Sequence, residues 1–135
     1  HDWHPTMPGY PPWNQGMIRR GTINNGFWAI EVAAEGNYLV SLRRWPVESG
    51  VGFHDAVPPG EDVPGGTPYP AGEQTRYVRA GLEIGDMRLE KQIAGNDKET
   101  TFEVSLPQGP IELYTWLEEE DGTKRGAYYV GFSRR

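Results

Sequence analysis

The stretch from Gly26 to Pro46 contains two runs in which apolar and polar residues alternate. A period of two residues is typical of strands that turn one face towards a core. Between the runs, Ala34-Glu35-Gly36-Asn37 contains glycine and asparagine, which tolerate the positive φ of a hairpin turn. The sequence predicts a β-hairpin that ends at Pro46, because proline has no N–H to donate to a ladder. The residues expected on its inward face are Trp28, Ile30 and Val32 in the first strand and Tyr38, Val40 and Leu42 in the second.

Further alternating runs follow in the second half of the chain, separated by short polar turns. Gly85-Asp86 separates two of them, and Asp121-Gly122 is a pair that favours a hairpin. No helical period of 3.6 residues continues for more than two turns. Evenly spaced short strands predict an all-β fold, an antiparallel β-sandwich of about eight strands. The runs cover residues 79–93, 100–106, 111–117 and 126–132.

Two segments rich in proline and glycine interrupt this pattern. Residues 1–22 contain four prolines, which exclude a helix and most ladder pairing and so predict an irregular N-terminal arm. Its bulky aromatic residues, Trp3 and Trp13 among them, are expected to dock on the domain or on a neighbour, because exposing them to water is costly. Residues 46–74 contain six prolines and predict a long loop. We favour a solvated excursion between two strands over a ligand-contacting loop.

Composition and charge restrict the class of protein further. A chain of 135 residues fits a single domain, residues 1–135, with a core of its own. The formal net charge of −6 argues against a nucleic-acid partner. No apolar run approaches the length of about 18 residues that spans a membrane. The chain does not begin with methionine, so we expect a fragment of a longer protein whose targeting signals lie elsewhere.

Patterns for catalysis and metal binding are weak. The chain has no cysteine, and no serine lies in a Gly-x-Ser-x-Gly elbow that would indicate a nucleophile. The spacing of His1, Asp2 and His4 can ligate zinc, but residues at a chain end do not make a preformed site. Carboxylate pairs for glycoside hydrolysis stay open, because nineteen acidic residues make many chance pairs. We therefore assign no catalytic residue, metal ligand or cofactor to this chain.

Arginine and tryptophan at the end of the central stretch form the most informative polar pattern. Arg43 and Trp45 are in the outward phase of the second strand, whereas Arg44 is in the inward phase. A buried guanidinium needs partners, and its planar fork suits a carboxylate, a cluster of carbonyls or a sulfate. We favour a structural ion pair between Arg44 and a loop. An exposed tryptophan beside arginine would suit a sugar-stacking platform or an interface with another domain.

Short strings spread over nearly the whole chain carry a family resemblance, which is weakest between Glu48 and Glu73. The strings are His1-Asp2-Trp3-His4, Pro12-Trp13-Asn14-Gln15, Ile18-Arg19, Gly21, Gly26-Phe27-Trp28, Glu31-Val32, Gly36-x-Tyr38, Leu42-Arg43-Arg44-Trp45-Pro46, Leu82-x-Ile84-Gly85 and Gly126-Ala127-Tyr128-Tyr129-Val130. Together they resemble the C-terminal region of a group of bacterial arylsulfatases.

The resemblance implies that the catalytic machinery lies upstream of His1. Sulfatases use a formylglycine made within a Cys/Ser-x-Pro-x-Arg motif, which does not occur in this sequence. They also use a Ca²⁺, which would belong to the missing catalytic domain, and the parent protein would be periplasmic or secreted. Several strands are also similar to carbohydrate-binding modules with a galactose-binding-like jelly roll, which implies that topology for the sandwich.

We accordingly predict a non-catalytic C-terminal accessory domain that docks on the N-terminal catalytic domain of the same chain and helps to shape the sulfate-ester cleft. The alternative is an independent carbohydrate-binding module that recognises a sulfated glycan, and a small hydrolase is a third hypothesis. A docking domain would expose an apolar patch and bind no glycan alone, whereas a module would retain glycan. The residues expected to contact the partner or the glycan are Trp3, Trp13, Asn14, Arg43, Arg44 and Trp45.

Overall fold

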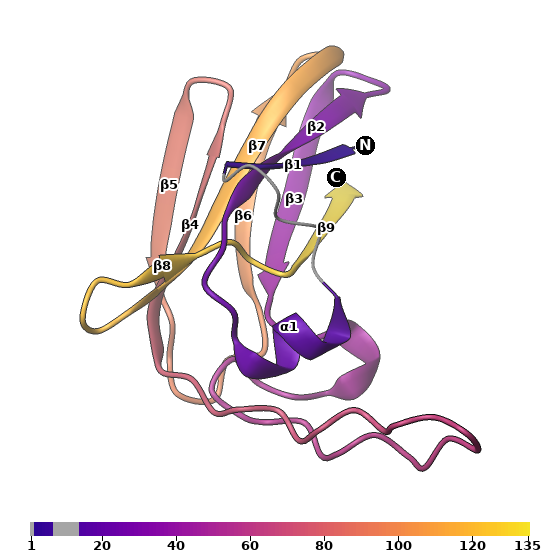
Figure 1. Ribbon diagram of the computed structural model, residues 1–135. Coiled ribbons are helices and arrows are strands. Elements are labelled where there is room, and N and C mark those ends of the chain that lie inside the picture. The colour runs from indigo at the N-terminus through magenta and orange to yellow at the C-terminus, as the bar shows by residue number, and fades with distance from the viewer. Residues whose placement is uncertain (1, 7–13) are drawn as a thin grey trace.

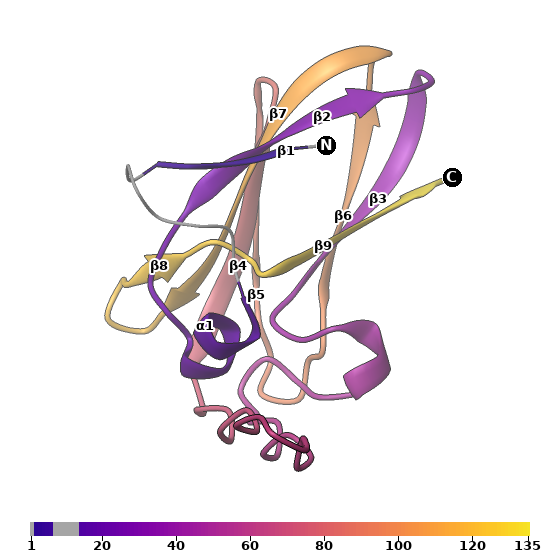
Figure 2. The same cartoon turned by 45° about the vertical axis from the view of Figure 1, so that its right-hand side comes forward.

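Two antiparallel sheets packed face to face form the body of the molecule (Figures 1 and 2). The structure is a computed structural model that describes residues 2–6 and 14–135. Its nine strands in the described residues confirm the predicted all-β sandwich. The larger sheet contains, in spatial order, β1 (Asp2–Pro5), β2 (Gly26–Val32), β7 (Gly109–Glu119), β4 (Tyr77–Ile84) and β5 (Met87–Gln92), with β8 (Lys124–Arg125) also paired to β7. The smaller sheet contains β6 (Thr100–Leu106), β3 (Gly36–Arg43) and β9 (Tyr129–Arg134) in that order.

The central stretch does not form the predicted hairpin, because β2 and β3 lie in opposite sheets. β2 pairs with β1 and β7, whereas β3 pairs with β6 and β9. The link of residues 33–35 carries the chain from one sheet to the other. Alternation assigns a face to each strand but does not choose its neighbour, and both strands still point their apolar faces at one shared core. The hairpin prediction was wrong for that reason.

The faces predicted to point inwards meet in one continuous core between the sheets. Val40 and Leu42 of β3 are fully buried, and Trp28 and Ile30 of β2 pack against the core while partly exposed. Burial of these apolar side chains is the main force that holds the two sheets together. Further core residues in the predicted phase are Leu82 and Ile84 in β4, Phe102, Val104 and Leu106 in β6, and Leu113 and Leu117 in β7.

The two turns predicted at Gly85-Asp86 and Asp121-Gly122 are present, but the last strand begins later than predicted. Gly85, at φ 59°, lies in the tight turn between β4 and β5. Asp121-Gly122 lies in the turn between β7 and β8. The last strand was predicted from Gly126, but β9 begins only at Tyr129, after β8 and an irregular link.

The predicted irregular N-terminal arm contains two regular elements in its described part. β1 pairs with the start of β2, and Pro5 lies at its end, where a missing N–H is tolerated. α1 (Gln15–Arg20) begins after Asn14, whose Oδ1 accepts a hydrogen bond of 3.0 Å from the Met17 N–H. The helix ends at Gly21, at φ 62°. The expectation was wrong because every proline of the arm precedes the helix.

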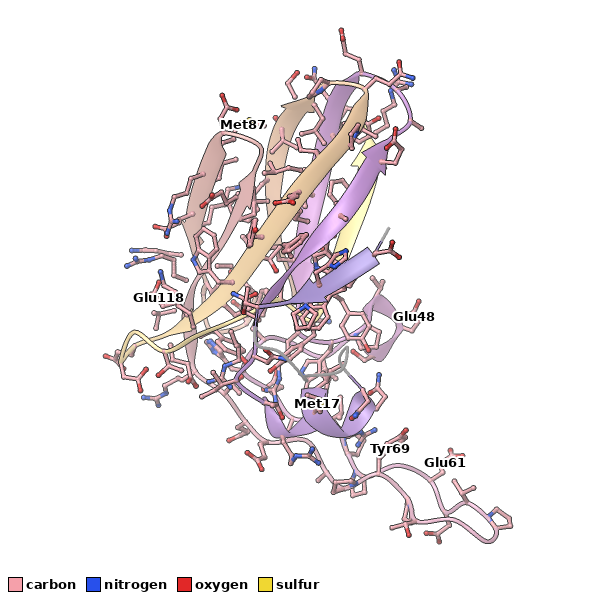
Figure 3. The ribbon with its side chains drawn as sticks, turned by 45° about the horizontal axis from the view of Figure 1, so that its top comes forward. Met17, Glu48, Glu61, Tyr69, Met87 and Glu118 are labelled. Carbon is pink, nitrogen blue, oxygen red and sulfur yellow. The ribbon has the colours of Figure 1, made fainter. Side chains whose placement is uncertain are left out.

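The chain between β3 and β4 contains one short 3₁₀ helix, η1 (Val47–Ser49), and is otherwise irregular. Residues 57–72 extend away from the sandwich at the end that holds α1, and Glu61 and Tyr69 mark this segment in Figure 3 (see also Figure 1). We call residues 57–72 the projecting loop. No helix of the described residues is long and apolar enough to cross a membrane.

Candidate functional site

Three of the strings that carry the family resemblance lie together at the α1 end of the sandwich. Ile18 from α1, Trp45 after β3 and Tyr128 before β9 form one buried cluster, separate from the main core. The Tyr128 hydroxyl donates a hydrogen bond of 3.0 Å to the carbonyl of Thr22, 106 positions away in the chain. We call Ile18, Trp45 and Tyr128 the basal cluster. It joins the N-terminal arm, the end of β3 and the start of β9.

Arg44 lies beside the basal cluster and is fully buried, as its inward phase predicts. Its Nη1 donates to Thr75 Oγ1 at 2.8 Å and its Nη2 donates to the Glu73 carbonyl at 2.5 Å, while the carbonyls of Asp55 and Arg19 lie 3.4 Å away. These acceptors are neutral, so a group of carbonyls takes the place of the carboxylate in the expected ion pair. Burial lowers the pKa of Arg44. The guanidinium thus connects the end of β3 to α1 and to two separate parts of the chain between β3 and β4.

Trp45 does not lie on an exposed face, so the outward phase predicted for it is wrong. The side chain is 2% exposed, and its Nε1 donates a 2.9 Å hydrogen bond to the carbonyl of Asp55. The Arg44 guanidinium carbon lies 4.4 Å from the centre of the indole. β3 ends at Arg43, so its alternation does not continue to residue 45. Arg43 alone of the three reaches the surface in part, and its Nη2 lies 2.6 Å from Glu99 Oε2.

Arg125 is a second buried arginine, which the sequence analysis did not single out. It is 5% exposed, and its Nη2 lies 2.5 Å from Glu119 Oε2 while its Nη1 donates to the carbonyl of Gly21. Burial raises the pKa of both Tyr77 and Tyr128, and the nearby Arg125 charge opposes this rise. The local string Thr123-Lys124-Arg125 follows a turn and is typical of exposed residues, so no sequence signal marked it.

The other predicted contact residues are spread along the N-terminal arm. Trp3 in β1 meets Trp28 of β2 edge to face, with ring centres 6.4 Å apart. Asn14 caps α1, and its amide oxygen is used in that cap. Trp13 lies outside the described residues. The structure therefore brings Arg44 and Trp45 close to α1 but does not gather all six residues into one patch, and their contact role stays a prediction.

An apolar cleft opens between β2 of the larger sheet and β9 of the smaller sheet. Its volume is about 580 Å³, and aromatic and aliphatic side chains dominate its walls. On the opposite side of the sandwich, Lys91 of β5 donates to the carbonyl of Thr101 in β6, and this contact joins the two sheets. The sandwich thus has one closed side and one open side. The side chains that line the cleft include Trp28, Ile30, Val32, Tyr38, Tyr129 and Phe132.

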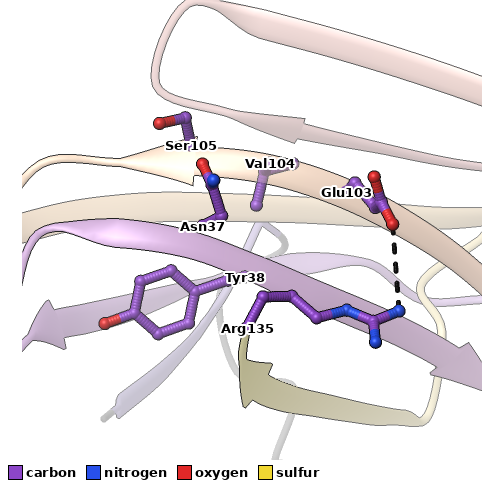
Figure 4. A pocket seen from close by; sticks show the side chains of 6 residues that line it. All are labelled: Asn37, Tyr38, Glu103, Val104, Ser105 and Arg135. Atoms are coloured by element: carbon purple, nitrogen blue, oxygen red, sulfur yellow. Dashed lines mark ion pairs between the residues drawn. The ribbon is translucent and has the colours of Figure 1, made fainter.

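Two other hollows are polar and shallow. One lies on β3 and β6 near Tyr38 and Ser105, with a volume of about 550 Å³, and an Arg135–Glu103 ion pair of 3.8 Å lies at its edge (Figure 4). The other, of about 480 Å³, lies beside the base of the long loop, near His54. The sticks in Figure 4 come from β3, from β6 and from Arg135 after β9.

The described histidines are engaged in structural contacts. His54 Nε2 lies 2.6 Å from the carbonyl of Tyr77, and His4 stacks on Phe27 with ring centres 4.8 Å apart. Among residues 2–6 and 14–135, no three histidine or acidic side chains are arranged to hold a metal ion. The described surfaces offer aromatic side chains in the apolar cleft and charge pairs on the exposed faces.

Comparisons of the chain with protein-family models, with curated proteins and with solved structures find no match.

Proposed function

We propose that this chain is a non-catalytic accessory domain of a sulfatase-type hydrolase, and that it docks on a catalytic domain carried by the same protein. The convergence of the strings in the basal cluster supports this proposal. Strings that resembled a family by chance would be expected to scatter over the structure. Here three of the strings, from α1, the end of β3 and the start of β9, pack their side chains on one another.

The hydrogen bonds around the basal cluster strengthen the argument. Gln15 of one string donates its Nε2 to the Tyr129 hydroxyl of another at 2.7 Å. Arg44 of a third string contacts the carbonyl of Arg19 in α1. Residues that depend on one another in this way are retained together when a fold is shared. These contacts support a resemblance that concerns the architecture of an accessory domain, and the catalytic group would belong to the neighbouring domain.

The complete reading frame and its protein product test the proposal. We expect a Cys/Ser-x-Pro-x-Arg motif upstream of residue 1 and hydrolysis of an aryl sulfate by the full protein. The isolated residues 1–135 should show no hydrolysis, and the full protein truncated before residue 1 should lose thermal stability or activity. Hydrolysis by the isolated chain would contradict the non-catalytic role. A reading frame without the motif would contradict the sulfatase assignment.

The apolar cleft favours a second candidate function, an independent carbohydrate-binding module. Aromatic side chains such as Tyr38, Tyr129 and Phe132 line a cavity of about 580 Å³, which is within the range of small-ligand sites. Aromatic faces suit the apolar faces of sugar rings. A glycan array with matched sulfated and unsulfated members tests this function on the isolated chain. Binding that Phe132→Ala weakens at least about tenfold, while the distant Val47→Ala does not, would favour it over the docking role.

A further inference from the structure

The projecting loop, residues 57–72, is a protrusion whose two halves are joined by backbone hydrogen bonds. The Gly72 N–H donates to the Val57 carbonyl at 2.9 Å near its base, and the Gly60 N–H donates to the Tyr69 carbonyl at 2.8 Å farther out. It has no regular ladder, yet its two halves run beside each other away from the sandwich (Figures 1 and 2). Its five prolines fix φ at their positions, which lowers the conformational entropy that binding would cost.

Two arginines from the body of the domain hold both halves of the projecting loop. Arg44 bonds to the carbonyls of Asp55 and Glu73, which flank the loop on either side. Within the projecting loop itself, the carbonyls of Pro58 and Pro70 each accept a hydrogen bond of 2.8 Å from Arg19 Nη1. A loop that only connected two strands through solvent would need no such support. Most residues of the loop are exposed, in agreement with a solvated excursion, and the two arginines fix its orientation on the domain.

The outer part of the projecting loop exposes apolar and acidic side chains together. Val63 is 57% exposed and Tyr69 is 52% exposed, and the Arg19 guanidinium carbon lies 5.4 Å from the Tyr69 ring centre. Glu61 and Asp62 lie beside them at the surface. From residue 55 to residue 74 the chain contains four acidic residues and no lysine or arginine. The loop thus presents two exposed apolar side chains, and the charged side chains that it carries itself are acidic.

We infer that the projecting loop is the element that docks this domain on its partner, by inserting Val63 and Tyr69 into an apolar hollow bordered by lysine and arginine on a protein surface. Pre-ordering by Arg19, Arg44 and the prolines lowers the entropic cost of docking. The acidic residues favour a basic rim and oppose acidic surfaces. The identity of the partner as the catalytic domain of the same protein rests on the proposed function, whereas the chemistry of the contact does not.

Photo-crosslinking in the full protein, made from its complete reading frame, tests this inference. A benzophenone amino acid is placed at residue 63 and, as a control, at residue 47 of η1, where Val47 is 63% exposed but lies outside the projecting loop. We expect crosslinks from residue 63 to residues outside 1–135, at a site that mass spectrometry maps to an apolar surface with basic neighbours. Crosslinks from residue 63 that are confined to residues 1–135, or no more frequent than those from residue 47, would overturn the inference.

A charge reversal at the tip tests the basic rim. The double variant Glu61→Lys and Asp62→Lys should lower the yield of the residue-63 crosslink at least about fivefold, and 0.5 M salt should lower it in the unmodified protein. The control Glu48→Lys reverses an exposed acid on η1 and should leave the yield unchanged. An equal yield in the double variant would exclude charge complementarity and overturn the proposed partner chemistry.

Aryl sulfate hydrolysis, measured on the same full protein, separates this inference from the proposed function. A protein that forms the residue-63 crosslink but hydrolyses no aryl sulfate would retain the docking loop and reject the sulfatase assignment. A protein that hydrolyses aryl sulfate but forms no such crosslink would retain the assignment and reject the docking loop.

Discussion

In the larger sheet, the indole ring of Trp116 lies directly over Gly81 of the neighbouring strand. The two residues are register partners in β7 and β4, and a Cβ built on residue 81 would lie 2.2 Å from Trp116 Cζ2. The guanidinium carbon of Arg88 lies 4.5 Å from the centre of the indole. The ring is therefore held between a strand backbone and a cation, and glycine is required at residue 81 because of this close approach.

Gly81→Ala is expected to destabilise the domain by about 1–3 kcal/mol, because the added methyl group overlaps the indole and forces the strand or the ring to move. Urea denaturation followed by tryptophan fluorescence measures the free energy of unfolding. Gly95→Ala is the control, since nothing lies within 4 Å of a Cβ at that turn, and its effect should stay below about 0.5 kcal/mol. Equal stability of the two variants would contradict the close approach.

Arg44→Met should lower the free energy of unfolding by about 3 kcal/mol or more. The substitution leaves a fully buried position without the donor that serves the part-buried Thr75 hydroxyl and Glu73 carbonyl. Arg135→Gln is the matched control, because the Arg135 side chain is 58% exposed and its ion pair with Glu103 is long, which predicts less than about 1 kcal/mol. Proteolysis at the long loop should also become faster in Arg44→Met alone. If Arg44→Met lost no more stability than Arg135→Gln, the acceptors around Arg44 would not depend on its guanidinium.

Trp45→Ala should cost about 3–5 kcal/mol, because the indole is almost fully buried in the basal cluster. Trp28→Ala should cost less, about 1–3 kcal/mol, since Trp28 is only partly buried at the edge of the core. Thermal and urea denaturation of both variants give the order of the two effects. The outward phase assigned to residue 45 from the sequence predicts the reverse order, so this pair of variants separates the two interpretations.

Alkaline pH should destabilise the domain through its buried tyrosines. Burial raises the pKa of Tyr77 and Tyr128 above the value of about 10 that tyrosine has in an unfolded chain. Above about pH 10 the unfolded chain loses these protons while the folded chain keeps them, so stability falls as pH rises. Below about pH 10 both states hold the protons, and this contribution to stability is fully present.

Tyr77→Phe tests this pH dependence, because it removes the titrating hydroxyl of one of the two buried tyrosines. We expect the variant to match the unmodified protein at about pH 8 and to lose less stability at about pH 11, where one titrating group has been removed. Urea midpoints at a series of pH values measure the difference. Parallel decline of the two proteins would show that Tyr77 does not titrate with unfolding.

The alternation of apolar residues was enough to predict the class of fold and most inward faces. Residues 100–106 became β6 without change, and Leu82, Ile84 and Leu113 are buried as expected. These assignments depend on the two-residue period of a strand, which is local and survives in any arrangement of sheets. Arg44 is buried as predicted, although it lies just after the end of β3. The finer jelly-roll or galactose-binding-like topology stays a prediction.

Tertiary structure alone decided which strands are neighbours and which polar groups meet. β2 pairs with β7 instead of β3 because pairing depends on contacts between distant segments, which periodicity does not contain. Trp45 is buried because β3 ends at Arg43 and the chain turns inwards after it. Arg125 and the acceptors of Arg44 come from segments far apart in the chain, and only packing brings them together. A local pattern determines the face on which a side chain lies, but the partner that it meets there depends on how the whole chain is folded.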